Sequence, residues 1–204
     1  YISQPFAINA DVFDYKNFGD FNAEYSFENY DNNSNPTLGM QFSLLGGFKM
    51  NIDQTYRRFP YAESSLGFTC KLVPDGKIVL ATLFKAKALF DDQYEFYQAA
   101  TVGGDTDLRG YRNQRFSGKQ SYYQSTDVRW NLGKLQNGFA PISYGVFSGF
   151  DYGRVWLKNE NSDQWHHSFG GGIWFNGVNL LTAKFSYFRS GDGGRISAGL
   201  GFGF

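Results

Sequence analysis

The sequence predicts an all-β protein whose strands form an antiparallel transmembrane β-barrel. Three observations support this: polar and apolar residues alternate along nearly the whole chain, the alternating segments are long, and their apolar faces carry aromatic rings. The composition agrees, because 20% of the residues are aromatic and 25 are glycine, against only 5 prolines. Small residues on one face and rings on the other are typical of a barrel surrounded by lipid.

Period-two alternation divides the chain into about ten expected strands. They lie near residues 1–14, 18–30, 37–53, 59–73, 77–91, 119–133, 141–157, 164–176, 178–189 and 194–204. Most have about 11–16 residues, whereas soluble strands usually have about 5–6 and a tilted membrane-spanning strand needs about 9–11. No apolar run reaches the roughly 18 residues of a transmembrane helix.

The two faces of single strands differ in character. In the last segment Ile196, Ala198 and Leu200 alternate with small or polar residues, and the segments 141–157 and 178–189 repeat the pattern. A soluble sandwich or a lipocalin-like barrel, the alternative reading, would bury such an apolar face. The opposite faces here are rich in Gly, Ser, Lys and Asp, which favours a polar lumen and a lipid-facing exterior.

The connections between strands alternate in length. "VPDGK" at 73–77 and "FNGVN" at 175–179 are tight turns with Asp-Gly or Asn-Gly, whereas 91–119 and 157–165 are longer. Outer-membrane barrels have short periplasmic turns and longer extracellular loops, so we expect 91–119 on the outside. No repeat or linker interrupts the chain, and residues 1–204 are expected to form one barrel domain.

Composition and spacing argue against several other classes of protein. Lys+Arg and Asp+Glu are equal at 19 each, without the basic excess of a nucleic-acid-binding protein. The single cysteine, Cys70, excludes an internal disulfide and is interpreted as a small buried side chain. His166 and His167 are neighbours on a strand and face opposite sides, so no metal site is expected. No nucleophile elbow or phosphate loop is present, which predicts no cofactor and no enzymatic activity within these residues.

The chain ends in "SAGLGFGF". The spacing of Ser197, Gly199, Phe202 and Phe204 resembles the β-signal that the barrel-assembly machinery reads in bacterial outer-membrane proteins. A strand of this kind could pair its open edge with the edge of another sheet.

The segment "GGDTDLRGYRNQRFSGK" at 103–119 interrupts the alternation. Its core "LRGY" resembles the loop-six motif of the BamA/TamA superfamily of outer-membrane proteins, which includes two-partner-secretion transporters. That family also has a Phe-x-Asp-x-Gly-like motif two strands later, where this chain has "GFDYGR" at 149–154. The resemblance implies that the loop folds back into the barrel lumen, where Arg109 meets Asp151. The residues assigned to this lock are Leu108, Arg109, Gly110, Tyr111, Phe150, Asp151 and Gly153.

Simple chemistry is consistent with such a lock. Gly149 and Gly153 flank Asp151 and leave room for a loop to approach. A guanidinium and a carboxylate can form a bidentate contact, and losing one partner of a buried pair costs about 3–5 kcal/mol. Gly110 is expected to adopt a backbone conformation that other residues avoid, and Tyr111 to supply an anchoring ring.

The resemblance also sets expectations for architecture and function. Members have sixteen strands, so these ten are expected to be the C-terminal part of a longer barrel, with a short closed barrel as the alternative. The implied function is insertion, assembly or translocation of proteins at the bacterial outer membrane. The implied partners are lipopolysaccharide and phospholipid, client proteins at the seam, and the remaining N-terminal strands. Two alternatives stay open: a barrel that anchors or exports a fused phosphoesterase or patatin-like enzyme, and a passive pore.

Overall fold

Nine long strands form one antiparallel sheet in the computed structural model, which describes residues 16–53, 57–92, 94–136, 141–157, 164–178 and 180–200. The strands are β1 (Phe18–Tyr30), β2 (Gly39–Asn51), β3 (Arg58–Lys71), β4 (Ile78–Leu89), β7 (Gln120–Gln136), β8 (Pro141–Trp156), β9 (His166–Gly177), β10 (Leu181–Ser190) and β11 (Gly193–Leu200). Each strand pairs with the next one along the chain, except that β4 pairs with β7 across the long loop. The predicted all-β antiparallel fold is confirmed.

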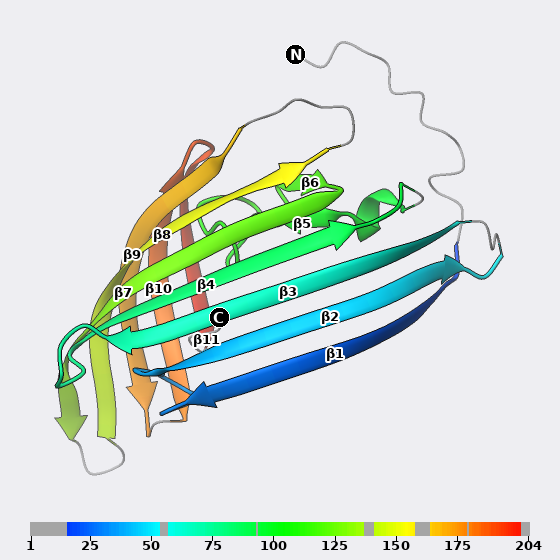
Figure 1. Ribbon diagram of the computed structural model, residues 1–204. Coiled ribbons are helices and arrows are strands. Elements are labelled where there is room, and N and C mark those ends of the chain that lie inside the picture. Colours follow the sequence, from blue (N-terminus) through cyan, green and yellow to red (C-terminus); the bar gives the residue numbers. More distant parts are fainter. Residues whose placement is uncertain are drawn as a thin grey trace.

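The sheet curls strongly, so that β9, β10 and β11 lie behind β3 and β4 in Figure 1. Within the described strands, β1 pairs only with β2 and β11 only with β10, which leaves two edges. The expected strand at 1–14 and the last four residues of the expected strand at 194–204 lie outside the described residues. In the part of the chain that the structure describes, no helix is long and apolar enough to span a bilayer.

Two details of the expected elements differ. The strand expected at 119–133 continues to Gln136, because a bulge between Asn131 and Gly133 lets pairing with β8 resume. The expected loop 91–119 contains a short helix, η2 (Phe96–Gln98), and a ribbon formed by β5 (Ala100–Val102) and β6 (Phe116–Gly118). The loop therefore has internal structure that its glycine-rich sequence did not reveal.

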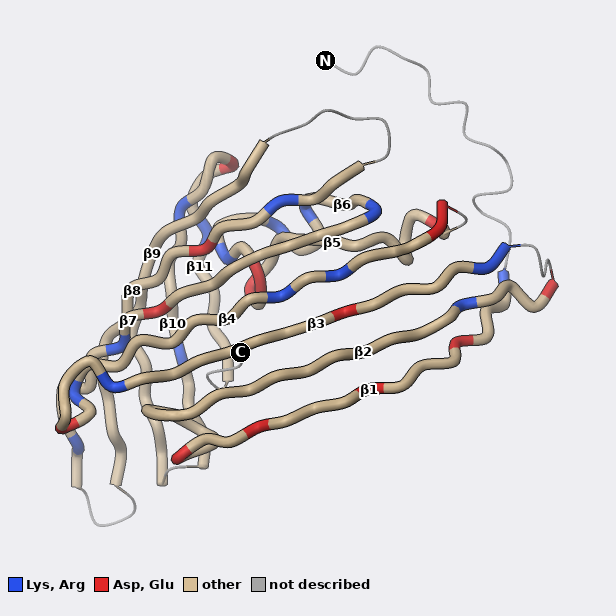
Figure 2. Tube along the Cα trace, in the orientation of Figure 1, with Lys and Arg blue, Asp and Glu red and all other residues tan. Residues whose placement is uncertain are grey.

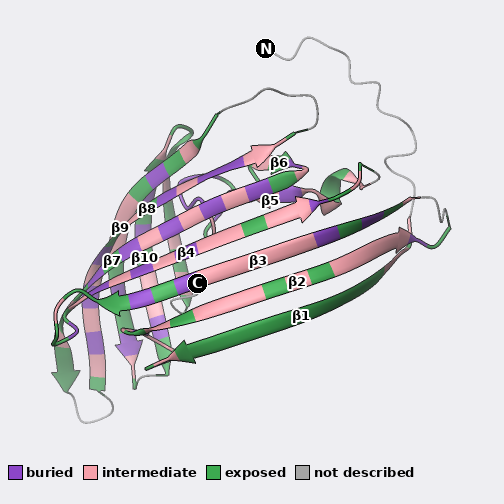
Figure 3. Cartoon of the chain, viewed as in Figure 1, coloured by how far each residue is buried: buried purple, intermediate pink, exposed green. Residues whose placement is uncertain are grey.

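The two faces of the sheet differ as the alternation predicts. We call the face that carries Asp151 the inner face, because the curled sheet and the long loop enclose it, and the opposite one the outer face. Along β7 and β8 buried residues alternate with more exposed ones (Figure 3). On the outer face large apolar side chains remain accessible, with Ile196 80% and Leu200 74% exposed. An apolar surface of this extent needs a partner other than water.

Cys70 does not fit its expected place. Its neighbour Thr69 is buried on the inner face of β3, so alternation turns Cys70 to the outer face, where it is exposed. The expectation of a buried thiol was therefore wrong.

The inner face of the curled sheet forms a trough, and the long loop fills part of it. Leu108 and Tyr111 of the loop pack with Val102 of β5 and with Leu83 and Tyr123 on the inner faces of β4 and β7. This apolar cluster holds the loop against the sheet and places the two residues between Leu108 and Tyr111, Arg109 and Gly110, deep inside the trough.

Candidate functional site

Arg109 lies at the innermost point of the long loop. Gly103 and Gly104 have φ values of 122° and 130°, which side chains rarely tolerate, and they start a compact turn. The Gly104 amide donates to the carbonyl of Leu108 at 3.3 Å, and the Gln114 amide to the carbonyl of Gly103 at 2.8 Å. These bonds close the loop and direct Arg109 towards the inner face.

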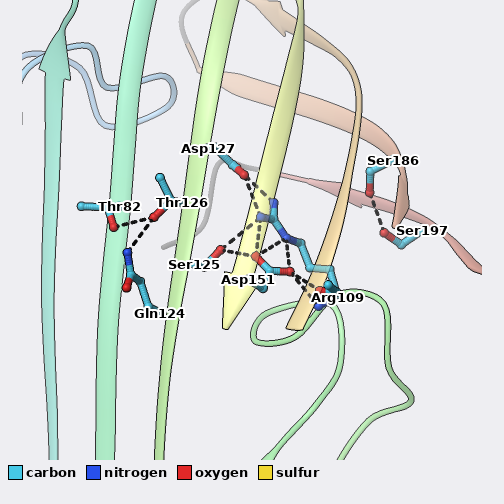
Figure 4. A network of polar contacts seen from close by, with 10 residues as sticks. Thr82, Arg109, Gln124, Ser125, Thr126, Asp127, Asp151, Ser186 and Ser197 are labelled. Atoms are coloured by element: carbon cyan, nitrogen blue, oxygen red, sulfur yellow. Dashed lines mark hydrogen bonds and ion pairs between the residues drawn. The ribbon is translucent and has the colours of Figure 1, made fainter. Parts of the chain in front are cut away.

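Asp151 on β8 receives the arginine in a bidentate contact (Figure 4). Arg109 Nη2 lies 2.6 Å from Asp151 Oδ1 and Nε lies 3.0 Å from Oδ2. The backbone amide of Arg109 also donates to Oδ2, at 3.0 Å. Hydroxyls of Ser125 and Ser168 donate to the same carboxylate, each at 2.9 Å. The wholly buried carboxylate is thus surrounded by donors from β7, β9 and the loop.

A second carboxylate shares the arginine. Asp127, on the inner face of β7, accepts from Arg109 Nη2 at 2.7 Å and from Nη1 at 3.1 Å. The centroid of the Phe188 ring lies 4.0 Å from the guanidinium carbon of Arg109. Burial alone would lower the pKa of Arg109, but the charges of Asp127 and Asp151 and their hydrogen bonds raise it above its usual value. We call Arg109, Ser125, Asp127, Asp151 and Ser168 the Arg109 clasp.

Two glycines allow the clasp to close. A Cβ atom at Gly149 would stand 2.5 Å from Arg109 Nη2, and one at Gly110 would stand 2.8 Å from the Cβ atoms of both Ser168 and Ser190. The φ angle of Gly110 is not positive, so the expectation that this glycine adopts a backbone conformation that other residues avoid was wrong. Its role is close approach to β9 and β10, where the Ser190 hydroxyl donates to its carbonyl at 2.7 Å.

Tyr111 attaches the loop to the strands beyond the clasp. Its hydroxyl donates to the His167 carbonyl at 3.3 Å, and its own carbonyl accepts from Arg195 Nη1 on β11 at 3.2 Å. Its ring packs edge-on against Phe116, which stacks on His166 with centroids 3.6 Å apart. The loop therefore contacts every strand from β7 to β11.

Two of the residues assigned to the lock take no part in the hydrogen bonds of the Arg109 clasp. Phe150 is 50% exposed on the outer face, because neighbours on a strand point to opposite sides and Asp151 points inwards. Gly153 is on the inner face, and the nearest neighbours of a Cβ there belong to β7, with the Cβ of Tyr123 at 2.8 Å. The structure brings Leu108, Arg109, Gly110, Tyr111 and Asp151 together.

Sequence reasoning missed Asp127. Alternation does place Ser125 and Asp127 on one face of their strand. It cannot say which residues of the next strand lie beside them on that face. The register that sets Asp127 against Gly149 follows the bulge at Asn131/Gly133. The available signal was a carboxylate in the middle of a strand, on the same face as Ser125.

A second internal contact lies at the other end of the trough. The turn at 31–38, between β1 and β2, reaches across to β7, β9 and β10. On β7, Arg129 Nη2 donates to the Pro36 carbonyl at 2.9 Å. Asn176 donates to the Ser34 hydroxyl at 3.0 Å, and Thr182 donates to its carbonyl at 2.6 Å. Two unrelated segments thus dock on the inner faces of the same group of strands.

The terminal signal is only partly described. Ser197 faces Ser186 across the β10–β11 pair with their hydroxyl oxygens 2.9 Å apart, and Gly199 faces Lys184. Phe202 and Phe204 lie outside the described residues. Recognition of this ending by an assembly machine stays a prediction.

Comparison with known proteins gives two matches. Residues 49–176, more than half of the chain, match the family model described as haemolysin secretion/activation protein ShlB/FhaC/HecB. No curated protein matches significantly. Among solved structures, the crystal structure of BamA from Haemophilus ducreyi lacking POTRA domains 1-3 superposes with a TM-score of 0.69 at 16% identity, covering 89% of this chain and 42% of that one. Identity this low shows a shared fold, and this chain spans less than half of the BamA chain.

Proposed function

This chain belongs to the ShlB/FhaC/HecB family of haemolysin secretion/activation proteins, and on that premise we propose that it forms part of an outer-membrane β-barrel that translocates proteins. In this proposal the apolar outer face contacts lipid, and the inner face lines the passage. Further strands would pair with the edges that β1 and β11 leave open among the described residues.

The Arg109 clasp is the observation that carries the proposal. It fixes a loop of about thirty residues inside the trough, where the loop narrows any passage along the inner face. The arginine side chain donates to two carboxylates and to the Ser125 hydroxyl, and these contacts position the loop. We assign no reaction to these residues.

A polar cavity beside the loop supports translocation. It has a volume of about 480 Å³ between the loop and the inner faces of β1 to β4 and β7. Its lining includes Glu24, Glu63 and Lys85, and Lys87 Nζ contacts Glu63 Oε1 at 2.7 Å. An unfolded polar polypeptide could exchange hydrogen bonds with such a wall, whereas an apolar core would exclude it.

The test uses the full-length protein in cells that also produce its secreted partner. We expect Arg109→Glu to abolish secretion, because it places three carboxylates together in a buried site. Arg112→Glu is the matched control, since Arg112 is an exposed arginine of the same loop. Secretion that survives Arg109→Glu at normal barrel levels would contradict the proposal.

A charge exchange sharpens this test. Arg109→Glu with Asp151→Lys restores one pair but leaves Asp127 beside the new carboxylate, so recovery should be small. Adding Asp127→Asn removes that repulsion and should increase recovery. If the triple variant secretes no more than the double variant, the contact with Asp127 has no role in fixing the loop.

Insertion of other barrels is the second candidate function. The observation in its favour is the edge of β11, which has no second neighbour among the described strands and could template a client strand. Depletion distinguishes the two candidates: loss of one secreted partner with unchanged levels of other barrels supports translocation, and a general fall in barrel levels supports insertion.

A further inference from the structure

The outer face of the sheet carries few charges, and all of them are arginine. Charged residues occur along most strands (Figure 2), but the pairing register places nearly all of them on the inner face. Among the described strand residues, the formally charged side chains on the outer face are Arg58, Arg154 and Arg189. All three lie at the end of the sheet that bears the long loop, and the opposite end of the outer face has none.

A groove lies on the outer face near two of these arginines. Small side chains on adjacent strands, namely Ala62 and Ser64 of β3 and Ala86 and Ala88 of β4, form its floor. Leu44, Tyr122 and Trp156 stand higher around it, and the groove has a volume of about 350 Å³. An apolar channel of this size accommodates a hydrocarbon chain better than a headgroup.

Arg154 borders this groove in the same cross-strand row as its floor. The register aligns Ser64 with Ala86, Ala86 with Tyr122, and Tyr122 with Arg154. The Arg154 guanidinium lies 4.6 Å from the ring centroid of Trp156, which lines the groove, and 5.2 Å from that of Trp165. Arg154 is only 9% exposed, so it lies buried behind the groove wall and is not itself open to a ligand.

Arg58 overlooks the same groove from the loop end. It is exposed and lies on the outer face of β3, four residues before Ala62, which corresponds to about 13 Å along a strand. The groove therefore has an exposed arginine above it at the loop end, and Tyr122 and Trp156 line it as rings of an interfacial aromatic belt would.

Resting on the proposed place in the outer membrane, we propose that this groove binds a phosphorylated glycolipid of the outer leaflet, with one acyl chain along Ala62, Ala86 and Ala88 and a phosphate at Arg58. Arginine binds phosphate through its planar set of donors. The restriction of outward charge to the loop end fits a headgroup that is present in one leaflet only. An anionic phospholipid would not require this asymmetry.

The experiment measures lipid affinity with full-length protein in detergent. Purified protein is titrated with bisphosphorylated lipid A, with its dephosphorylated form and with phosphatidylglycerol, and adducts are counted by native mass spectrometry. We expect lipid A to bind about tenfold more tightly than the other two. Equal affinity for the dephosphorylated form would overturn the role of Arg58, and equal affinity for phosphatidylglycerol would overturn the choice of glycolipid.

Variants locate the binding. Arg58→Gln should weaken lipid A binding about tenfold, and Ala86→Leu should weaken it by a similar factor by filling the groove. Arg189→Gln and Ala183→Leu are matched controls on the outer face of β10 and should change affinity less than twofold. Heat-modifiable mobility on gels verifies that each variant is folded. Unchanged affinity in both groove variants would overturn the proposal.

This outcome is separate from that of the proposed function. If the purified groove variants bind lipid A as tightly as the unaltered protein, and cells that produce them secrete normally, the lipid site alone is overturned. Normal secretion by Arg109→Glu overturns the translocation proposal alone, since Arg109 contacts no groove residue.

Discussion

The Arg109 clasp contains one cation and two carboxylates, and this imbalance predicts unequal roles for Asp127 and Asp151. Asp151 is wholly buried and accepts hydrogen bonds from the Arg109 side chain and backbone and from two serines. Asp127 accepts from the arginine side chain. Replacing either carboxylate with an amide leaves one cation and one carboxylate. Replacing Asp151 leaves more hydrogen-bond donors without a charged acceptor than replacing Asp127 does.

The magnitudes follow from these contacts. Asp151→Asn breaks the central buried pair and should destabilise the docked loop by about 3–5 kcal/mol. Asp127→Asn loses one charged acceptor but also relieves the repulsion between the two carboxylates, so we expect about 1.5 kcal/mol or less. Because each 1.4 kcal/mol is a factor of ten, the released loop should become at least about 100-fold more populated in the first variant and at most about tenfold in the second.

Limited trypsin digestion of the full-length protein in detergent measures this population. The side chains of Arg112 and Arg115 are exposed, but trypsin also needs the backbone around them in an extended form, so cleavage requires the loop to leave the trough. At low protease the rate follows the equilibrium fraction released. Neither carboxylate substitution alters the loop sequence, so the intrinsic cleavage rates stay the same. Glu63→Gln is the control, because Glu63 pairs with Lys87 and not with the loop. Equal rates for the two aspartate variants would refute the reasoning.

Further predictions concern the glycines, the second contact and pH. Gly110→Ala and Gly149→Ala should each release the loop, because the added Cβ collides with strand or clasp atoms, whereas Gly191→Ala, with its nearest contact at 3.6 Å, should not; trypsin digestion checks all three. Arg129→Gln should free the turn at 31–38 and raise single-channel conductance in planar bilayers, and an unchanged conductance would show that this turn does not obstruct the passage. Burial raises the pKa of the Asp107 carboxyl, so the docked loop should lose stability as pH rises from the ordinary carboxyl pKa towards the raised one, and Asp107→Asn should remove this loss. Hydrogen exchange of residues 103–119 at pH 4 and pH 7, corrected for intrinsic rates, measures the difference, and an identical pH dependence in Asp107→Asn would contradict the assignment.

The sequence was most informative where a local period determines the outcome. Alternation predicted which residues of β8 and β10 face inwards, since neighbouring residues on a strand must face opposite sides. Applied to Phe150, the same rule would have excluded it from the lock, because its neighbour Asp151 already faced inwards. Cys70 is a similar case. Its neighbour Thr69 faces inwards, so alternation turns Cys70 outwards although cysteine usually prefers a buried position.

Contacts between distant segments were beyond sequence reasoning. The sharing of Arg109 between β7 and β8 depends on a register set by a bulge, and the contact of Arg129 with Pro36 depends on how far the sheet curls. The role of Gly110 likewise depends on Ser168 and Ser190, which lie 58 and 80 residues further along the chain, and not on its own backbone angles. Neither curl nor register leaves a local pattern in the residues that it brings together.

The central claim is that the long loop is held inside the barrel by the Arg109 clasp, and a cross-link in intact cells tests it most directly. Arg115 and Asp192 are exposed partners on the loop and on the β10–β11 turn, with Nε and Oδ2 2.5 Å apart. Arg115→Cys and Asp192→Cys are combined in full-length protein with Cys70→Ser, and the cells are treated with a short bifunctional thiol reagent. We expect efficient cross-linking when Asp151 is present and a sharp fall with Asp151→Asn. Equal yields with and without Asp151, or no cross-link although both thiols react with a maleimide, would contradict the claim.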